Sequence, residues 1–307
     1  MTIVSDQHIP FLVEAVQTHW PNMRIIPMKS EEIDAEAVRE ADVLVVRTRT
    51  LVNESLLAGS RVRLVCTATI GFDHIDTVYC EKNGIRWMSC PGCNAQAVCD
   101  YIEEAIKESK GESRKAKVIG VVGVGHVGSL VAKMAERKGY TVLLNDPPKQ
   151  IGVSLDSIAT NSDIITFHVP LDATTYHLCD EAFLAKCQPH ALIINAARGG
   201  VVDEEALLQS GHPFILDTWE NEPNINPLVL QKAQLASMHI AGYSIEGKRN
   251  ATQMCLNTIA ETFQLPSIPT ISVPESHGDT APGWLARITE KLKKGDFETL
   301  RKNYALR

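Results

Sequence analysis

The fold of this chain is decided by the stretch Val118-Ile-Gly-Val-Val-Gly-Val-Gly-His-Val-Gly128. An apolar run leads into three glycines with the spacing Gly-x-Gly-x-x-Gly, at Gly123, Gly125 and Gly128, and then into residues 127–138, whose apolar side chains recur with helical periodicity. The first glycine permits a tight turn, the second lets the backbone approach a pyrophosphate, and the third lets helix and strand pack closely. The order of strand, glycine turn and helix predicts the phosphate-binding turn of a dinucleotide-binding domain.

The carboxylate that follows this turn indicates which dinucleotide binds. The next apolar strand, residues 141–145, is followed by Asp146, about 20 residues after the glycine turn, which is the spacing of a carboxylate that accepts both ribose hydroxyls. A carboxylate there repels the 2′-phosphate of NADP, so the sequence predicts NAD. His126 and Val127 join the glycines as predicted cofactor-binding residues, because backbone N–H groups at the start of a helix are available to an anion.

Short β-branched runs alternate with helical stretches along most of the chain. Strands are predicted at residues 3–5, 43–46, 64–68, 117–122, 141–145, 164–167, 191–195 and 214–216, and helices at 245–263 and 284–294. Repeated strand–helix–strand units form parallel sheets covered on both faces, so the predicted fold class is α/β with two doubly wound parallel sheets. Pro91-Gly92 and a polar stretch at 107–117 interrupt the pattern, and we expect a domain boundary near residue 95.

The composition limits the kinds of partner. The 307 residues suffice for two domains, and a formal net charge of −7 leaves no basic field for nucleic acid or for a membrane surface. No apolar run approaches the roughly 18 residues that span a membrane, and no secretory leader is recognisable. We therefore expect a cytoplasmic protein that binds small molecules.

The eight cysteines are scattered through apolar segments, which favours reduced, buried thiols over a disulfide framework. Cys90-Pro-Gly-Cys93 has the spacing of a metal-binding or redox pair. A zinc site needs further ligands at matching spacing, and a redox pair normally opens a helix after a strand. We therefore interpret this pair as two thiols in a turn and expect no metal site.

Three further segments place polar side chains at or just after the ends of apolar strands. They are Ile193-Ile-Asn-Ala-Ala-Arg198-Gly-Gly-Val-Val-Asp203, Leu216-Asp217-Thr-Trp-Glu-Asn-Glu222-Pro223 and His239-Ile-Ala-Gly242-Tyr243. Open α/β sheets bind ligands at the carboxyl ends of their strands, so these side chains are candidates for one site.

In these segments the sequence resembles the D-isomer-specific 2-hydroxyacid dehydrogenases, because the arginine, glutamate and histidine motifs occur in the order of that family. The resemblance implies that Arg198 binds the substrate carboxylate and the 2-oxygen, that His239 is the acid/base, and that Glu222 supports it. It also implies further cofactor contacts at Asp217 and Gly242.

These residue types suit the reaction of the family. Removing a hydride from a carbinol carbon also requires loss of the hydroxyl proton, and histidine titrates near neutral pH. A neighbouring carboxylate favours the imidazolium as the proton arrives, and a planar guanidinium binds a carboxylate in a bidentate manner that lysine cannot match. We therefore expect an NAD-dependent 2-hydroxyacid dehydrogenase.

One branch of the family, which acts on a phosphorylated four-carbon hydroxyacid, resembles this chain over most of residues 3–252. The segments that carry the resemblance are 90–98, 120–128, 145–148, 238–248 and, in the tail, 297–304. By this resemblance Thr48, Thr69 and Tyr243 contact a phosphorylated hydroxyacid. Candidates for its phosphate group, each of which also fits a solvated surface charge, are Arg47, Arg49 and Lys248.

The resemblance also implies an organisation for the whole chain. A flavodoxin-like substrate domain occupies residues 1–94, a Rossmann NAD-binding domain occupies 95–250, and a return helix with a C-terminal dimerisation element occupies 251–307. Residues 266–296 make this element shorter than it usually is in the family, although the closing motif remains. We expect a homodimer, whose contact need not be that of the family.

Two alternatives stay open at the level of sequence. One is another D-2-hydroxyacid dehydrogenase, of the 3-phosphoglycerate or hydroxypyruvate type. The other is a non-catalytic binding protein that senses NADH, against which the intact Arg198, Glu222 and His239 argue. His168 fits a residue of the nicotinamide pocket and a packing residue equally well.

Overall fold

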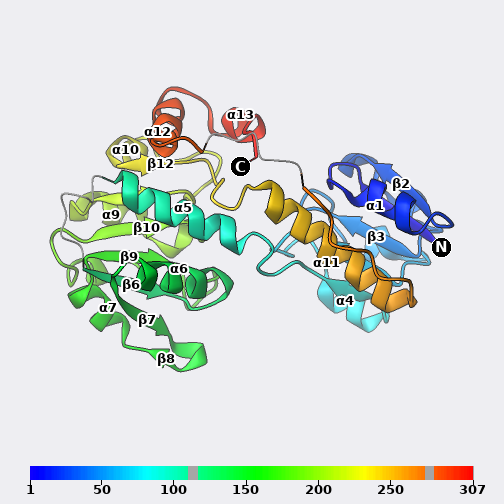
Figure 1. Ribbon diagram of the computed structural model, residues 1–307, viewed down its shortest axis with the longest axis horizontal. Coiled ribbons are helices and arrows are strands. Elements are labelled where there is room, and N and C mark those ends of the chain that lie inside the picture. Colours follow the sequence, from blue (N-terminus) through cyan, green and yellow to red (C-terminus); the bar gives the residue numbers. More distant parts are fainter. Residues whose placement is uncertain (110–116, 274–279, 307) are drawn as a thin grey trace. The chain divides into compact units, whose positions relative to one another are not determined.

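A computed structural model describes residues 1–109, 117–273 and 280–306. The contacts divide the chain into two compact units, each built around its own sheet (Figure 1). One unit consists of Met1–Asn94 and the segment that starts at Ser244, and the other of Ala95–Tyr243 and residues 280–306. Both sheets carry helices between parallel strands, so the predicted α/β fold class is confirmed.

The first unit contains a five-stranded parallel sheet with the order β2-β1-β3-β4-β5. Its strands are β1 (Thr2–Asp6), β2 (Arg24–Met28), β3 (Val43–Val46), β4 (Leu64–Thr67) and β5 (Arg86–Met88). Its helices are α1 (Leu12–His19), α2 (Ala35–Val38), α3 (Glu54–Leu57), α4 (Thr77–Lys82) and α11 (Ile245–Phe263). This strand order is that of flavodoxin-like folds.

The strands of this sheet follow the apolar pattern of the sequence where they are central. The four residues of β3 are fully buried, because helices cover both faces of a parallel sheet. The edge strands β2 and β5 were not predicted, since each begins with an exposed arginine and β2 contains Pro27. Proline is tolerated in an edge strand because one side of that strand has no ladder partner.

The second unit contains a seven-stranded sheet with the order β12-β11-β10-β9-β6-β7-β8. Its strands are β6 (Val118–Val122), β7 (Thr141–Asp146), β8 (Ile151–Gly152), β9 (Ile164–Phe167), β10 (Leu192–Asn195), β11 (Phe214–Leu216) and β12 (Leu235–Ala236). All pairs are parallel except β7 with β8. The reversal of strand order at β6 and β9 is the switch point of a Rossmann sheet, where ligands bind.

Helices connect these strands and cover the sheet. They are α5 (Ala95–Glu108), α6 (His126–Arg137), α7 (Leu155–Asn161), α8 (Glu181–Leu184), α9 (Glu204–Ser210), α10 (Pro227–Lys232), α12 (Trp284–Lys294) and α13 (Phe297–Lys302). Figure 1 shows α12 beside the edge strand β12. The Thr289 hydroxyl of α12 accepts a hydrogen bond from Ala236 N at 2.8 Å, so a side chain covers part of the exposed sheet edge.

The predicted helices at 245–263 and 284–294 are present as α11 and α12. Their allocation differs from the sequence-based division at residues 250 and 251. The apolar side chains of α11, among them Leu256 and Ile259, pack in the core of the first unit, whereas those of α12, among them Leu285, pack in the core of the second. Within the described residues, no helix is both long and apolar enough to cross a membrane.

Candidate active site

The predicted site residues of the second unit lie at the carboxyl ends of its parallel strands. Gly123 follows β6, Asp146 ends β7, Arg198 follows β10, Asp217 follows β11 and His239 follows β12. Parallel strands end at the same edge of a sheet, so the topology brings together residues that are up to 116 positions apart in the chain.

The glycine turn has the geometry of a dinucleotide cradle. Gly123 adopts φ +89°, and a Cβ there would lie 2.6 Å from the carbonyl oxygen of His168. A Cβ on Gly128 would lie 1.9 Å from the carbonyl oxygen of Gly123, so only glycine allows α6 to approach β6 this closely. Gly125, which precedes His126 and Val127 at the start of α6, has open space where its Cβ would be. The turn therefore fits a pyrophosphate approaching the backbone.

Asp146, the predicted ribose contact, lies beside the glycine turn. Its Oδ2 atom accepts a hydrogen bond from Val124 N at 2.8 Å, which fixes the carboxylate beside the glycine turn. Lys149 lies 3.5 Å from the same oxygen and donates to Val124 O at 2.7 Å. The sequence did not reveal this lysine, which offsets part of the negative charge of Asp146.

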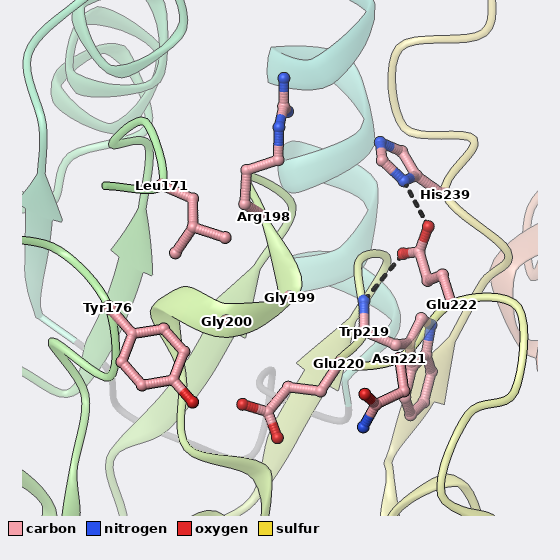
Figure 2. A pocket seen from close by; sticks show the side chains of 10 residues that line it. All are labelled: Leu171, Tyr176, Arg198, Gly199, Gly200, Trp219, Glu220, Asn221, Glu222 and His239. Carbon is pink, nitrogen blue, oxygen red and sulfur yellow. Dashed lines mark hydrogen bonds and ion pairs between the residues drawn. The ribbon is translucent and has the colours of Figure 1, made fainter. Parts of the chain in front are cut away.

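A cavity of about 390 Å³ brings together the three predicted catalytic residues (Figure 2). Its lining consists of Leu171, Tyr176, Arg198, Gly199, Gly200, Trp219, Glu220, Asn221, Glu222 and His239. His239 and Arg198 extend to the same side in Figure 2, whereas Glu220 and Asn221 point away from them. Glu220 pairs with His177 and points away from His239, because the segment turns at Asn221, which has φ +56°.

Glu222 holds His239 through a two-sided contact. Glu222 Oε2 lies 2.8 Å from His239 Nδ1, and Glu222 Oε1 accepts a hydrogen bond from Trp219 N at 2.9 Å. With Nδ1 engaged by the carboxylate, Nε2 is the nitrogen that remains for proton exchange with a ligand. A carboxylate fixed in this way orients the imidazole.

Arg198 is positioned by its backbone. Asn195, which is 1% exposed at the end of β10, donates from Nδ2 to Arg198 O at 2.8 Å and accepts from Ala197 N at 3.0 Å. A Cβ on Gly199 would lie 1.9 Å from the carbonyl oxygen of Trp219, so the turn after β10 lies directly on the segment that carries Glu222. The arginine side chain is exposed, as a residue that meets an anionic ligand needs to be.

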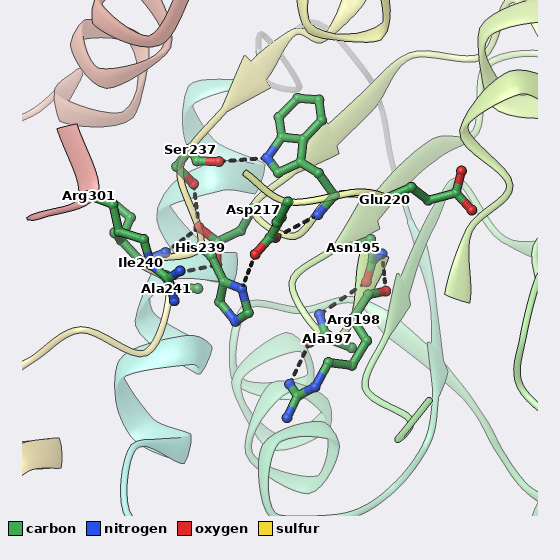
Figure 3. Close-up of polar contacts among 12 residues, drawn as sticks. Asn195, Ala197, Arg198, Asp217, Glu220, Ser237, His239, Ile240, Ala241 and Arg301 are labelled. Atoms are coloured by element: carbon green, nitrogen blue, oxygen red, sulfur yellow. Dashed lines mark hydrogen bonds and ion pairs between the residues drawn. The ribbon is translucent and has the colours of Figure 1, made fainter. Parts of the chain in front are cut away.

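Asp217 holds the His239 segment in place (Figure 3). Its Oδ1 accepts hydrogen bonds from Ser237 Oγ at 2.6 Å and from Ile240 N at 2.7 Å, and its Oδ2 accepts one from Ala241 N at 2.9 Å. Its carbonyl oxygen accepts the N–H of His239 at 2.7 Å. His239 has φ +58°, an uncommon conformation for a residue with a Cβ, which surrounding contacts have to maintain. Asp217 is thus an anchor of the histidine; the cofactor contacts predicted for it and for Gly242 remain predictions.

His168 is a neutral group in this site. It follows β9, and its Nε2 lies 3.0 Å from the Thr166 hydroxyl. Burial lowers the pKa of its imidazole to about 3, so the ring carries no charge near neutral pH. Its carbonyl lies against Gly123, and these contacts favour the packing interpretation over a role in proton transfer.

The first unit contains the other two predicted substrate residues, each two positions beyond a central strand. Thr48 follows β3 and is exposed, and Thr69 follows β4. The Thr69 hydroxyl lies 2.6 Å from that of Thr67 and donates to Gly71 O at 2.9 Å. Both residues therefore lie at the carboxyl edge of their own sheet, where a ligand site is expected.

The phosphate candidates of the first unit differ in how far their charge is compensated. Arg47 binds Asp6 through Nε at 2.9 Å and Nη2 at 3.3 Å. Burial raises the pKa of Asp6, but hydrogen bonds from Arg47, His8 N and Ser30 outweigh burial and hold that pKa below its ordinary value. Arg47 is therefore neutralised by a buried carboxylate.

The remaining candidates lie in different surroundings. Arg49 is exposed and lines a pocket of about 340 Å³, and Lys248 lies on α11.

The predicted burial of the thiols is confirmed, since all eight cysteines are buried and unbridged. Cys90 Sγ lies 3.8 Å from Cys255 Sγ and donates to Thr67 O. Burial raises the pKa of Cys93 to about 12, which makes its thiol a packing group rather than a nucleophile. In the described ranges, no three His, Cys, Asp or Glu side chains form a potential metal site.

Comparison with known proteins defines the class. Residues 96–241 match the family described as D-isomer specific 2-hydroxyacid dehydrogenase, NAD binding domain. D-lactate dehydrogenase from Aquifex aeolicus, solved with NAD and lactic acid, superposes with a TM-score of 0.65 at 23% identity, over 86% of this chain and 96% of that one. NAD-bound 3-phosphoglycerate dehydrogenase from Entamoeba histolytica superposes with a TM-score of 0.70 at 22% identity, over 89% of this chain and 99% of that one. The fold is that of the D-2-hydroxyacid dehydrogenases, and residues 96–241 correspond to the NAD-binding domain of that family.

More similar relatives narrow the class to one group. The erythronate-4-phosphate dehydrogenase of Bacteroides fragilis is 41% identical over 338 aligned positions, which cover all of this chain and 97% of the relative. That of Ectopseudomonas mendocina is 38% identical over 350 positions, covering all of this chain and 92% of the relative. The chain belongs to the erythronate-4-phosphate dehydrogenase family. Both alignments are longer than the 307 residues of this chain, so the relatives carry residues that it lacks.

Proposed function

We propose that this protein oxidises 4-phospho-D-erythronate to (R)-3-hydroxy-2-oxo-4-phosphobutanoate with reduction of NAD. The observation that carries the proposal is the His239–Glu222 pair, at 2.8 Å, in one cavity with Arg198. The relatives that share 41% and 38% identity bear the name of this activity. An enzyme with this activity works in the biosynthesis of pyridoxal 5′-phosphate, vitamin B6.

The residues that hold the cofactor are the glycine turn with the start of α6 and the carboxylate beside it. They are Gly123, Gly125, His126, Val127, Gly128 and Asp146, with Asp217 and Gly242 on the opposite side of the switch point. Bound NAD supplies the acceptor for the hydride that leaves C2 of the substrate.

The protein's own residues manage the substrate and the proton. Arg198 binds the C1 carboxylate and the C2 oxygen, which orients C2 and stabilises charge on that oxygen. His239 takes the C2 hydroxyl proton at Nε2 while C2 loses its hydride, so the C–O single bond becomes a carbonyl. Glu222 stabilises the imidazolium that forms. Thr48, Thr69 and Tyr243 contact the remainder of the substrate.

Absorbance at 340 nm tests this function with a panel of 2-oxoacids and NADH. The expected result is oxidation of NADH with 3-hydroxy-2-oxo-4-phosphobutanoate in strong preference to 3-phosphohydroxypyruvate and hydroxypyruvate. His239→Ala should lower kcat by roughly a hundredfold or more, as removal of a general acid/base does. His190→Ala, which removes an exposed histidine paired with Asp163, is the matched control and should retain activity.

The other outcomes identify the alternatives. Turnover of only 3-phosphohydroxypyruvate or hydroxypyruvate would retain the mechanism and reject the substrate. Binding of NADH without turnover of any 2-oxoacid would support an NADH-sensing protein. Cytoplasmic location and a homodimer are part of the proposal, and light scattering on the purified protein decides the second of these.

A further inference from the structure

The C-terminal helix α13 brings a cation to the segment that carries His239. Arg301 donates a hydrogen bond from Nε to Tyr243 Oη at 3.2 Å, and its guanidinium carbon lies 5.8 Å from the centroid of the Tyr243 ring. The Tyr304 ring packs near the same ring, with centroids 6.4 Å apart. The closing motif 297–304 is therefore attached to the active-site side of the second unit.

Tyr243 and the catalytic histidine belong to one short, tightly bonded segment. Tyr243 N donates to Ile240 O at 2.9 Å, and Ile240 N donates to Asp217 Oδ1 at 2.7 Å. Asp217 also binds the backbone of His239, so these hydrogen bonds fix Tyr243 relative to the imidazole. In the view of Figure 3, His239 lies between Arg301 on one side and Arg198 on the other.

Within residues 1–109, 117–273 and 280–306, no carboxylate compensates the charge of Arg301. Its side chain is partly buried, and it forms no ion pair with any carboxylate in the described part of the chain. A guanidinium has five N–H donors, of which the contact with Tyr243 uses one. The chain has a net charge of −7, so a multiply charged anionic substrate has to be bound by local cations such as this one.

We propose that Arg301 binds the phosphate group of the substrate, an inference that rests on the proposed function. 4-Phosphoerythronate has a carboxylate at C1 and a phosphate on C4, with the reacting C2 hydroxyl between them. In the view of Figure 3, Arg198 and Arg301 lie on the two sides of His239, which matches this order of charges. Arginine also suits phosphate because its planar N–H groups form paired, charge-assisted hydrogen bonds.

The contacts of the closing motif 297–304 hold α13 in the second unit. Phe297 is buried in the core of the second unit, and the Asp296 carboxylate accepts a hydrogen bond from Thr299 N at 2.8 Å, which caps α13. These contacts fix the helix that presents Arg301. The motif therefore contributes to substrate binding, whatever the rest of the C-terminal region does.

Steady-state kinetics of Arg301→Gln with 4-phosphoerythronate and with unphosphorylated erythronate tests the proposal. The KM for 4-phosphoerythronate should rise roughly tenfold to hundredfold, as loss of a charge-assisted contact predicts, while kcat is retained. The kcat/KM for erythronate should stay unchanged, so the preference for the phosphorylated compound falls by the same factor. Arg301→Lys, which keeps the charge, should recover part of the affinity.

Lys302→Gln is the matched control, because it removes an exposed charge from the next position of the same helix. Unchanged Tm and NADH affinity in Arg301→Gln establish that the variant is folded. If Arg301→Gln instead loses Tm, Arg301→Lys serves as the folded variant, and its KM rise with 4-phosphoerythronate alone carries the test.

Two results would overturn the proposal while leaving the function intact. The first is an unchanged KM of Arg301→Gln for 4-phosphoerythronate. The second is an equal loss of kcat in Arg301→Gln with 4-phosphoerythronate and with erythronate, reproduced by Tyr243→Phe. The second result would make Arg301 a positioning residue for Tyr243. A wild-type protein that turns over another 2-hydroxyacid but not 4-phosphoerythronate would reject the proposed function, and this inference with it.

Discussion

Replacement of Asp217 by asparagine separates its observed role as an anchor from its predicted role as a cofactor contact. The substitution turns one carboxylate oxygen into an NH2 group, which then faces a buried donor. In the less costly orientation the NH2 group meets Ala241 N, and the remaining oxygen keeps Ile240 N and Ser237 Oγ. One buried N–H therefore loses its acceptor.

The structure sets the size of the effect. An unpaired buried donor costs about 1 to 3 kcal/mol. At about 2 to 4 °C per kcal/mol for a domain of this size, Tm should fall by roughly 2 to 12 °C. The carbonyl oxygen and the carboxylate of Asp217 bind three successive N–H groups, 239–241, so the histidine should also shift. A displacement on the order of 1 Å lowers kcat by roughly a hundredfold.

Differential scanning fluorimetry, NADH titration and initial rates measure the three consequences. Asp180→Asn is the matched control, because the Asp180 carboxylate caps α8 by accepting the N–H of Phe183, and asparagine caps a helix equally well. Asp217→Asn should lower Tm and kcat, with a smaller change in NADH affinity. A variant with unchanged Tm and kcat but greatly weakened NADH binding would refute the anchoring role and support the cofactor contact.

Three further predictions concern groups around the cofactor turn and the cavity. Burial raises the pKa of Glu204 to about 7, so folded protein holds this proton more tightly than unfolded protein, and stability falls as pH rises from about 4.5 to about 7. Glu204→Gln should therefore raise the free energy of unfolding at pH 8 by on the order of 3 kcal/mol and change it little at pH 4. Urea titrations at the two pH values measure this difference, and equal effects at both would contradict the raised pKa of Glu204. Gly199→Ala should lower both Tm and kcat, because its Cβ would lie 1.9 Å from the Trp219 carbonyl oxygen. Gly125→Ala has open space for its Cβ, so it should keep Tm and weaken NADH binding roughly tenfold. Similar behaviour of the two variants would count against the role of the glycine turn as a dinucleotide cradle. Asp146→Ser should narrow the preference for NADH over NADPH in initial rates, and an unchanged preference would show that another group selects the cofactor.

The sequence predicted the central strands and the order of the site residues because those features follow from local patterns. The buried run of β3 and the glycine turn after β6 are examples. The edge strand β2 escaped prediction, since Arg24 and Pro27 break the apolar pattern that a half-covered strand does not need. The helix α11 was predicted within its observed bounds, but periodicity does not tell which sheet a helix covers.

The site shows the same division between local and tertiary information. The strand-end motifs predicted that Arg198, Glu222 and His239 come together. The anchoring role of Asp217 could not be read from sequence, because it depends on hydrogen bonds to backbone groups some 20 residues away. Lys149 and Arg301 were missed for a similar reason, since a single cation has no sequence signature until the fold places a carboxylate or an aromatic ring beside it.

The central claim is that the cavity of Arg198, Glu222 and His239 catalyses removal of the C2 hydride of 4-phosphoerythronate by NAD. The most direct measurement is proton NMR of the reduced cofactor formed from 4-phospho-D-erythronate deuterated at C2, with the wild type and with His239→Ala. We expect deuterium at C4 of the nicotinamide in the wild-type product and almost no reduced cofactor with the variant. Reduced cofactor without deuterium, or turnover that does not depend on His239, would contradict the account.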